Sequence, residues 1–143
     1  ITHKDLFDIQ NMALGGTNTD IANSIWEYSI FPDDTPLPDI VINSYSTNDM
    51  HVQTVGDAKD QNITLEELVF QMNEKFIRTL LSATSAANIN GTQCVKKAPL
   101  LLYFDDYLGN EQKEIKKILS YSRAINTLSA YYGFGLISYA DAV

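Results

Sequence analysis

Residues 38–45 read Pro-Asp-Ile-Val-Ile-Asn-Ser-Tyr, and this stretch decides the fold class. It follows a proline and is rich in β-branched residues, which is typical of a strand buried in a parallel sheet. Residues 99–104 repeat the pattern as Pro-Leu-Leu-Leu-Tyr-Phe. We therefore predict two buried parallel strands, at residues 39–45 and 99–104.

Helical patterns lie between and after these strands. Residues 64–84 form the clearest helix, because Thr64 and Glu67 make a capping box at its start. A second helix is predicted for residues 111–132, with Gly133 in the position of a C-terminal cap. The residues expected on the core faces of these two helices are Leu65, Leu68, Val69, Met72, Phe76 and Leu80, and then Ile115, Ile118, Leu119, Ile125 and Leu128.

Two outer segments complete the alternation of strands and helices. Residues 8–13, which run into paired glycines, and residues 134–139 are both predicted strands. A further helix starts at Asp20 and ends before Pro32, and its expected core face carries Ile21, Ile25 and Trp26. Such alternation implies right-handed crossovers and a parallel sheet with helices on both faces. The sequence thus predicts one three-layer α/β/α domain over residues 1–143.

Composition excludes several classes of function. The chain has 143 residues and a net charge of −8, with no basic stripe to neutralise phosphates, so nucleic acid is not an expected partner. No apolar run approaches the roughly 18 residues that a membrane span needs. Cys94 is the only cysteine, which excludes an internal disulfide. Asn62 and Asn90 begin N-glycosylation sequons, a weak pointer to the secretory pathway or the cell exterior.

The carboxyl ends of the predicted strands are where a ligand is expected. In open parallel sheets, ligands bind outside these ends. Three segments follow predicted strands, at residues 15–18, 46–49 and 105–107. We expect the first two to lie side by side at one edge of the sheet, because a single crossover joins their strands.

Two of these segments carry a family resemblance. Residues 11–17, Asn-Met-Ala-Leu-Gly-Gly-Thr, and residues 38–49, which end in Ser-Thr-Asn-Asp, resemble the second and third sequence blocks of the SGNH (GDSL-like) hydrolases. The tail at residues 131–143 is similar to the stretch after the fourth helix of some members. The chain departs from the family at Ser46, where the usual residue is glycine.

The resemblance implies a flavodoxin-like fold and an ester hydrolase that needs no cofactor and no metal. Matched by position, Gly16 would give a backbone N–H to the oxyanion hole and Asn48 a side-chain N–H. Donors held in place at a developing oxyanion are worth on the order of 3 kcal/mol each. The implied substrate is a small-molecule or glycan ester, such as an acylated carbohydrate, or a lipid ester.

The resemblance also implies that the rest of the catalytic triad lies outside this chain. The family places its serine in a Gly-Asp-Ser block at the end of the first strand, and its base in an Asp-x-x-His block late in the domain. Neither block is present in residues 1–143, so we expect a partial domain that is inactive alone. The family's first strand lies between its second and third, so residues 8–13 would lack their central neighbour.

Several other polar residues could serve as catalytic or metal-binding groups. His51 is a tempting base, but its position predicts a solvated or pocket-edge histidine. Ser44 is expected within a buried strand and Ser46 just after it, neither with a base. Asp105 and Asp106 form an acidic pair at a strand end that would suit a metal-dependent glycosyltransferase.

Besides the esterase and the metal-dependent glycosyltransferase, the chain could be a non-catalytic interaction or glycan-binding module on the same fold. In that case Gly15-Gly16 is only a turn and Asn48-Asp49 only an Asx-type loop. Cys94 is read as a bystander, because no base lies near it in the sequence.

Overall fold

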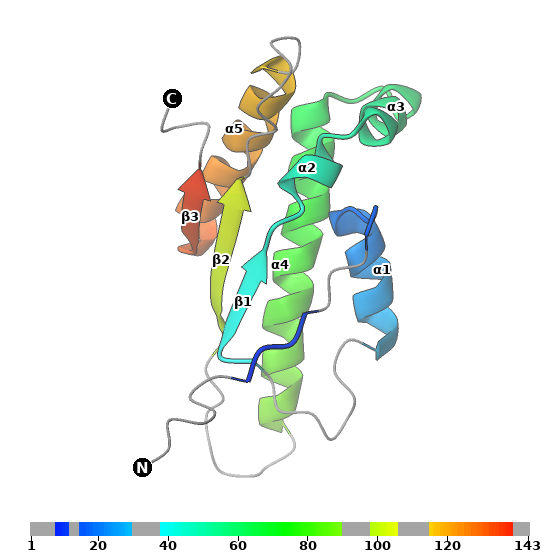
Figure 1. Cartoon of the computed structure of the whole chain (residues 1–143). Coiled ribbons are helices and arrows are strands. Elements are labelled where there is room, and N and C mark those ends of the chain that lie inside the picture. Colours follow the sequence, from blue (N-terminus) through cyan, green and yellow to red (C-terminus); the bar gives the residue numbers. More distant parts are fainter. Residues whose placement is uncertain (1–7, 12–14, 30–37, 90–97, 106–114, 139–143) are drawn as a thin grey trace.

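The computed structural model describes residues 8–11, 15–29, 38–89, 98–105 and 115–138. Its elements in chain order are α1 (Thr19–Ser29), β1 (Ile40–Asn43), α2 (Ser46–Asp49), α3 (Val52–Asp60), α4 (Leu65–Ile89), β2 (Leu100–Asp105), α5 (Ile115–Tyr132) and β3 (Gly135–Ser138). The strands of this described part form one parallel sheet of order β1-β2-β3 (Figure 1). The predicted α/β class with a parallel sheet is confirmed.

Local sequence signals set the ends of the two long helices. At the start of α4, the Glu67 N–H donates to Thr64 Oγ1 at 3.1 Å and the Thr64 N–H donates to Glu67 Oε2 at 3.0 Å. At the end of α5, Gly133 has a φ of +73°, and its N–H donates to the Ser129 carbonyl at 2.8 Å. The predicted capping box and glycine cap are both confirmed, because each depends only on residues within a few positions.

The core lies between one face of the sheet and helices α4 and α5. On the sheet side it contains Leu101 and Tyr103, and on the helix side it contains the predicted α4 residues from Leu68 to Leu80. The residues with less than 1% exposure are Val69, Tyr103, Tyr121, Ile125 and Leu128, together with five polar residues. The helical spacing of α4 therefore predicted its buried face correctly.

The predicted core faces of α1 and α5 need correction. Ile115 and Leu119 are 53% and 45% exposed. Tyr121 and Ala124 of α5, which were not predicted as core residues, are buried. In α1, Ile21 and Ile25 are 45% and 38% exposed, while Ala22 and Asn23 are buried. α1 docks on α4 through small and polar residues, since the Asn23 amide donates to the Met72 carbonyl at 2.9 Å. The side chain of Trp26 lies outside the described part.

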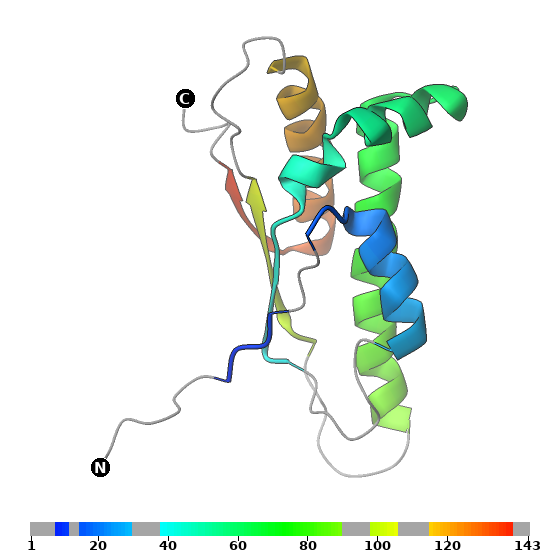
Figure 2. The ribbon, with the colours of Figure 1, turned by 45° about the vertical axis from the view of Figure 1, so that its right-hand side comes forward.

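The opposite face of the sheet is not covered by any described helix. Figure 2 shows α1, α4 and α5 on the same side of the strands. Side chains alternate along a strand, and the register aligns the outward residues of neighbouring strands. We call this surface the uncovered face; its residues are Ile40, Ile42, Leu100, Leu102, Phe104 and Ile137. Four of them, Ile40, Ile42, Leu100 and Ile137, are 50–59% exposed. The described residues thus show two of the three predicted layers.

The predicted first strand is not seen in the residues that are described. Residues 8–11 have no strand conformation, and Ile9 is 85% exposed. Residues 12 and 13 lie outside the described part. The strands of the described sheet are β1, β2 and β3, and residues 8–11 are not one of them.

Two short helices after β1 were not predicted. α2 occupies residues that the sequence predicted to form a loop. α3 occupies residues for which the sequence predicted no element. His51 is the N-cap of α3, and its ring Nδ1 accepts the Gln53 N–H at 3.4 Å. Within the described residues, no helix is long and apolar enough to cross a membrane.

Candidate functional site

The loop before α1 and the short helix α2 meet at the carboxyl end of the sheet. α1 begins at this end and α2 follows β1 directly, so the two segments lie next to each other (Figure 1). Gly16 in the loop has a φ of +79°, a conformation that favours glycine. A Cβ built there would meet nothing within 4 Å, so the Gly16 backbone borders open space.

Asn48 joins α2 to this loop. Its side-chain Nδ2 donates to the carbonyl oxygen of Thr17 at 2.6 Å, and Thr17 directly follows Gly16. The main chain of Asn48 is held as well, because its carbonyl accepts from Thr54 Oγ1 at 3.1 Å. An amide nitrogen carries a second hydrogen, which this bond to Thr17 leaves available. The structure thus brings the predicted pair, Gly16 and Asn48, into one corner.

The centre of this corner is Asp49, to which the sequence reading gave no role. Its carboxylate is fully buried and accepts the Thr19 N–H at Oδ1 and the Thr19 hydroxyl at Oδ2, both at 2.7 Å. The amide of Asn73 on α4 donates to the same Oδ2 at 3.2 Å. One carboxylate therefore connects α2, the start of α1 and the middle of α4.

Burial dominates the electrostatics of this corner. It raises the pKa of Asp49 to about 6, while the bonds from Thr19 and Asn73 act in the opposite direction and the charge of Asp20 adds a small rise. Burial, together with the charge of Asp49, also raises the pKa of the Tyr103 phenol on β2 well above its usual value. The folded chain thus favours the neutral form of Asp49 more than the unfolded chain does.

This preference predicts how stability changes with pH. The pKa of Asp49 rises from 3.8 to about 6 on folding, so its contribution is fully present below pH 3.8 and is lost as pH rises through about 6. The shift corresponds to roughly 3 kcal/mol less unfolding free energy at pH 8 than at pH 3.8. In urea unfolding at a series of pH values, the stability of the natural chain minus that of Asp49→Asn is expected to fall as pH rises.

The subtraction removes the titration of carboxylates that both chains share. Asp39→Asn, exposed just before β1 and at the other end of that strand from α2, serves as the control, because it removes one carboxylate without touching Thr19 or Asn73. A natural-minus-Asp49→Asn difference that stays flat, or that grows toward alkaline pH, would contradict the assignment.

The other candidate base and the two candidate nucleophiles differ in their exposure to solvent. His51 is exposed and caps α3, as its predicted solvated position implies. Ser44 was expected in a buried strand, but β1 ends at Asn43 and Ser44 is exposed. Ser46, the first residue of α2, is fully buried.

The acidic strand end does not form a metal site in the described residues. Asp105 is buried at 3% exposure, and its Oδ2 accepts the Ser138 hydroxyl at 2.9 Å across the β2–β3 pair. No group of metal-ligating side chains occurs among the residues that are described. Asp106 and Cys94 lie outside them.

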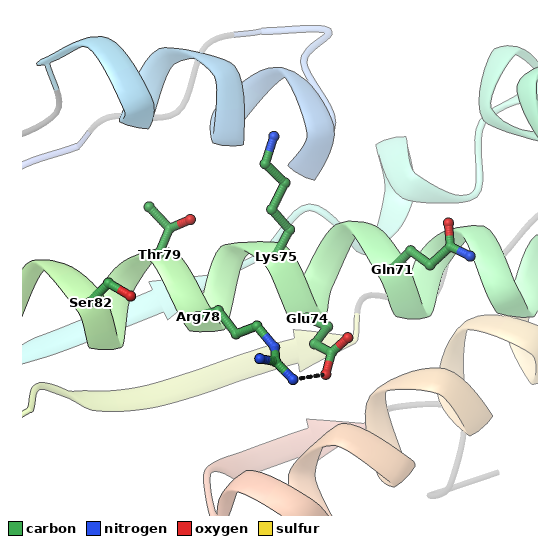
Figure 3. Close-up of a pocket in the computed structure, with 6 residues that line it drawn as sticks. All are labelled: Gln71, Glu74, Lys75, Arg78, Thr79 and Ser82. Atoms are coloured by element: carbon green, nitrogen blue, oxygen red, sulfur yellow. Dashed lines mark hydrogen bonds and ion pairs between the residues drawn. The ribbon is translucent and has the colours of Figure 1, made fainter.

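Two hollows lie on the surface beside α4 and the start of α1, and neither is lined by Gly16 or Asn48. The larger, of about 390 Å³, runs along α4, where Glu74 and Arg78 pair at 3.0 Å. Figure 3 shows its side chains on a single stretch of α4, with α1 on one side and α5 on the other. The smaller, of about 220 Å³, adjoins the start of α1 and is lined by Asp20, Asp57 and Asp60 among others. Its acidic wall makes the neighbourhood of the corner unfavourable for anions.

No protein-family model, curated protein or solved structure matches this chain.

Proposed function

We propose that this chain is part of an ester hydrolase of the SGNH type, in which Gly16 and Asn48 donate hydrogen bonds to the oxyanion. The observation that carries the proposal is the 2.6 Å bond from Asn48 Nδ2 to the carbonyl of Thr17, the residue after Gly16. It holds an uncharged amide donor beside a glycine whose backbone borders open space. Donors fixed before the reaction stabilise a tetrahedral intermediate without reorganising.

The proposal assigns the nucleophile and the base to blocks outside residues 1–143. Acyl transfer needs a nucleophile activated by a base within about 3 Å. The described part of the chain offers an exposed Ser44, a buried Ser46 and a His51 that caps a helix. A Gly-Asp-Ser-like block before Ile1 and an Asp-x-x-His block after Val143 would supply the two missing groups.

The same proposal accounts for the uncovered face. A parallel sheet is normally buried on both faces, yet four residues of this face are at least half exposed. In a flavodoxin-like sheet of order 2-1-3-4-5, the first strand would pair with β1, here the third strand of the fold, on the side away from β2. A helix next to that strand would cover Ile42 and Phe104, completing the three-layer architecture.

The substrate that fits best is a neutral ester of a carbohydrate or a lipid. The net charge of the chain is −8, and three aspartates line the hollow beside the corner. An anionic acyl group or alcohol would be repelled there.

A serine-directed fluorophosphonate probe tests the assignment of the nucleophile. We expect the folded 143-residue chain to remain unlabelled, and a longer chain with both flanking blocks to be labelled at a serine before Ile1. Ser44 is the exposed serine nearest to the corner in sequence, so Ser44→Ala in the longer chain serves as the control and should be labelled normally. Labelling of the short chain at Ser44 or Ser46 would show the triad assignment to be wrong.

A non-catalytic module on this fold is the second candidate. The observation in its favour is that the Asn48 amide already has a structural partner, the Thr17 carbonyl. A longer chain that folds but takes up no fluorophosphonate would support this reading over the esterase.

A further inference from the structure

One buried carboxylate ties together the two segments that carry the proposed oxyanion donors. Asp49 follows Asn48 in α2, and it binds both the N–H and the hydroxyl of Thr19 at 2.7 Å. Thr19 is three residues after Gly16. The Asn48-Asp49 pair therefore holds the loop at two points, because Asn48 binds Thr17 and Asp49 binds Thr19.

The Asp49 carboxylate is itself held from α4. Asn73 donates to Asp49 Oδ2 at 3.2 Å and to the Val69 carbonyl at 2.9 Å. Asn73 is fully buried, and its Oδ1 lies 3.4 Å from Thr19 Oγ1. The longest helix of the described chain thus serves as a fixed support for the loop and for α2.

We propose that Asp49 is the positioning residue of the oxyanion site and sets the Gly16 loop against Asn48 so that both donors converge on one point. The inference rests on the proposed function and deepens it. It assigns no contact between Asp49 and the substrate, since Asp49 has no exposed surface.

The hydrogen-bonding capacity of a carboxylate, compared with that of an asparagine side chain, supports this role. Asparagine would fill the same volume without the cost of burying a charge. However, an asparagine side chain presents one acceptor atom and one donor, whereas an ionised carboxylate presents only acceptors. Three donors converge on Asp49, two from Thr19 and one from Asn73, so an asparagine would place its own N–H against at least one of them.

Hydrogen exchange and two-dimensional NMR of the 143-residue chain test the proposal. In Asp49→Asn, the backbone amide of Thr19 is expected to exchange about tenfold or more faster, because its acceptor is weakened. The signals of the Gly16 amide and of the Asn48 side-chain amide should shift, while those of Ile125 and Leu128 in the core stay in place. Asp39→Asn, exposed just before β1 and at the other end of that strand from α2, is the matched control and should leave the Gly16 and Asn48 signals unmoved.

A merely structural Asp49 would give a different pattern. Asp49→Asn would then lower the melting temperature and leave the Gly16 and Asn48 signals unmoved, which would overturn the proposal. Should Asp49→Asn fail to fold, Asn73→Ala removes one donor and leaves both Thr19 bonds. It should shift the same signals by a smaller amount, and unmoved signals would again overturn the proposal.

Kinetics separate this inference from the esterase proposal. In an active longer chain, Asp49→Asn should lower kcat about tenfold with KM changed less than about twofold, because a displaced donor acts in the transition state. An unchanged kcat would overturn the positioning role while the esterase proposal stands. A longer chain that is inactive with Asp49 in place would overturn the esterase proposal and, with it, the oxyanion role of Asp49. The NMR shifts do not depend on turnover, so they would still show whether Asp49 holds the Gly16 loop against Asn48.

Discussion

Asn48→Ala is expected to lower kcat on a p-nitrophenyl ester by roughly 100-fold or more, in a longer chain that contains the serine and the base. The reason is that one of the two proposed donors to the oxyanion is lost. KM should change little, because the ester carbonyl of the ground state carries little charge. Steady-state kinetics of the purified variant give both parameters.

Stability and charge controls separate this effect from a loss of fold. Removing the Asn48 bond to the Thr17 carbonyl should cost about 1 kcal/mol of unfolding free energy, which a melting curve measures. Asn48→Asp keeps the shape but places a negative charge beside the oxyanion, so its kcat should fall at least as far as that of Asn48→Ala.

Asp105→Asn is the comparison for the metal-dependent alternative. Asp105 accepts the Ser138 hydroxyl at the end of β2, and asparagine can keep that bond through its own oxygen. We expect a much smaller effect on kcat than from Asn48→Ala. Equal losses from the two variants would support a metal-dependent reaction instead.

Ile42→Asp should destabilise a longer chain by about 3 kcal/mol or more, and the 143-residue chain by only about 1 kcal/mol, the cost of placing Asp in a strand. Ile42 is 59% exposed on the uncovered face, so a carboxylate there stays hydrated in the short chain. Beneath an added helical layer, the same carboxylate would be buried without a partner. Urea unfolding of both chains measures the two differences.

A matched substitution on the other side of the molecule controls for the added charge. Gln71 is exposed on α4 and borders the larger hollow, so Gln71→Asp should have the same small effect in both chains. An Ile42→Asp effect that is equally small in the long chain would show that no layer covers this face.

What the sequence determined by itself is the local structure. The β-branched run at Ile40–Asn43 and the apolar run at Leu100–Asp105 predicted the paired strands of the sheet. Thr64 and Glu67 predicted the start of α4, and Gly133 predicted the end of α5. These signals are reliable because each depends on the conformational preferences of neighbouring residues.

The tertiary structure alone decided which apolar residues are buried. Ile21 and Ile25 have helical spacing yet remain more than a third exposed, because α1 docks through Ala22 and Asn23. The alternation of strands and helices along the chain predicted a sheet covered on both faces, but the described helices cover only one (Figure 2). Periodicity identifies an apolar face of an element and does not say which other element packs against it.

The candidate site, too, was determined in part by the sequence and in part by the tertiary structure. The turn at Gly16 and the Asn48-Asp49 pair could be found from the sequence, because a glycine turn and a polar loop after a strand are local patterns. The role of Asp49 could not, since its partners Thr19 and Asn73 are 30 and 24 residues away in the chain. A buried carboxylate is defined by the donors that folding brings to it, and only the packing of α1, α2 and α4 assembles them.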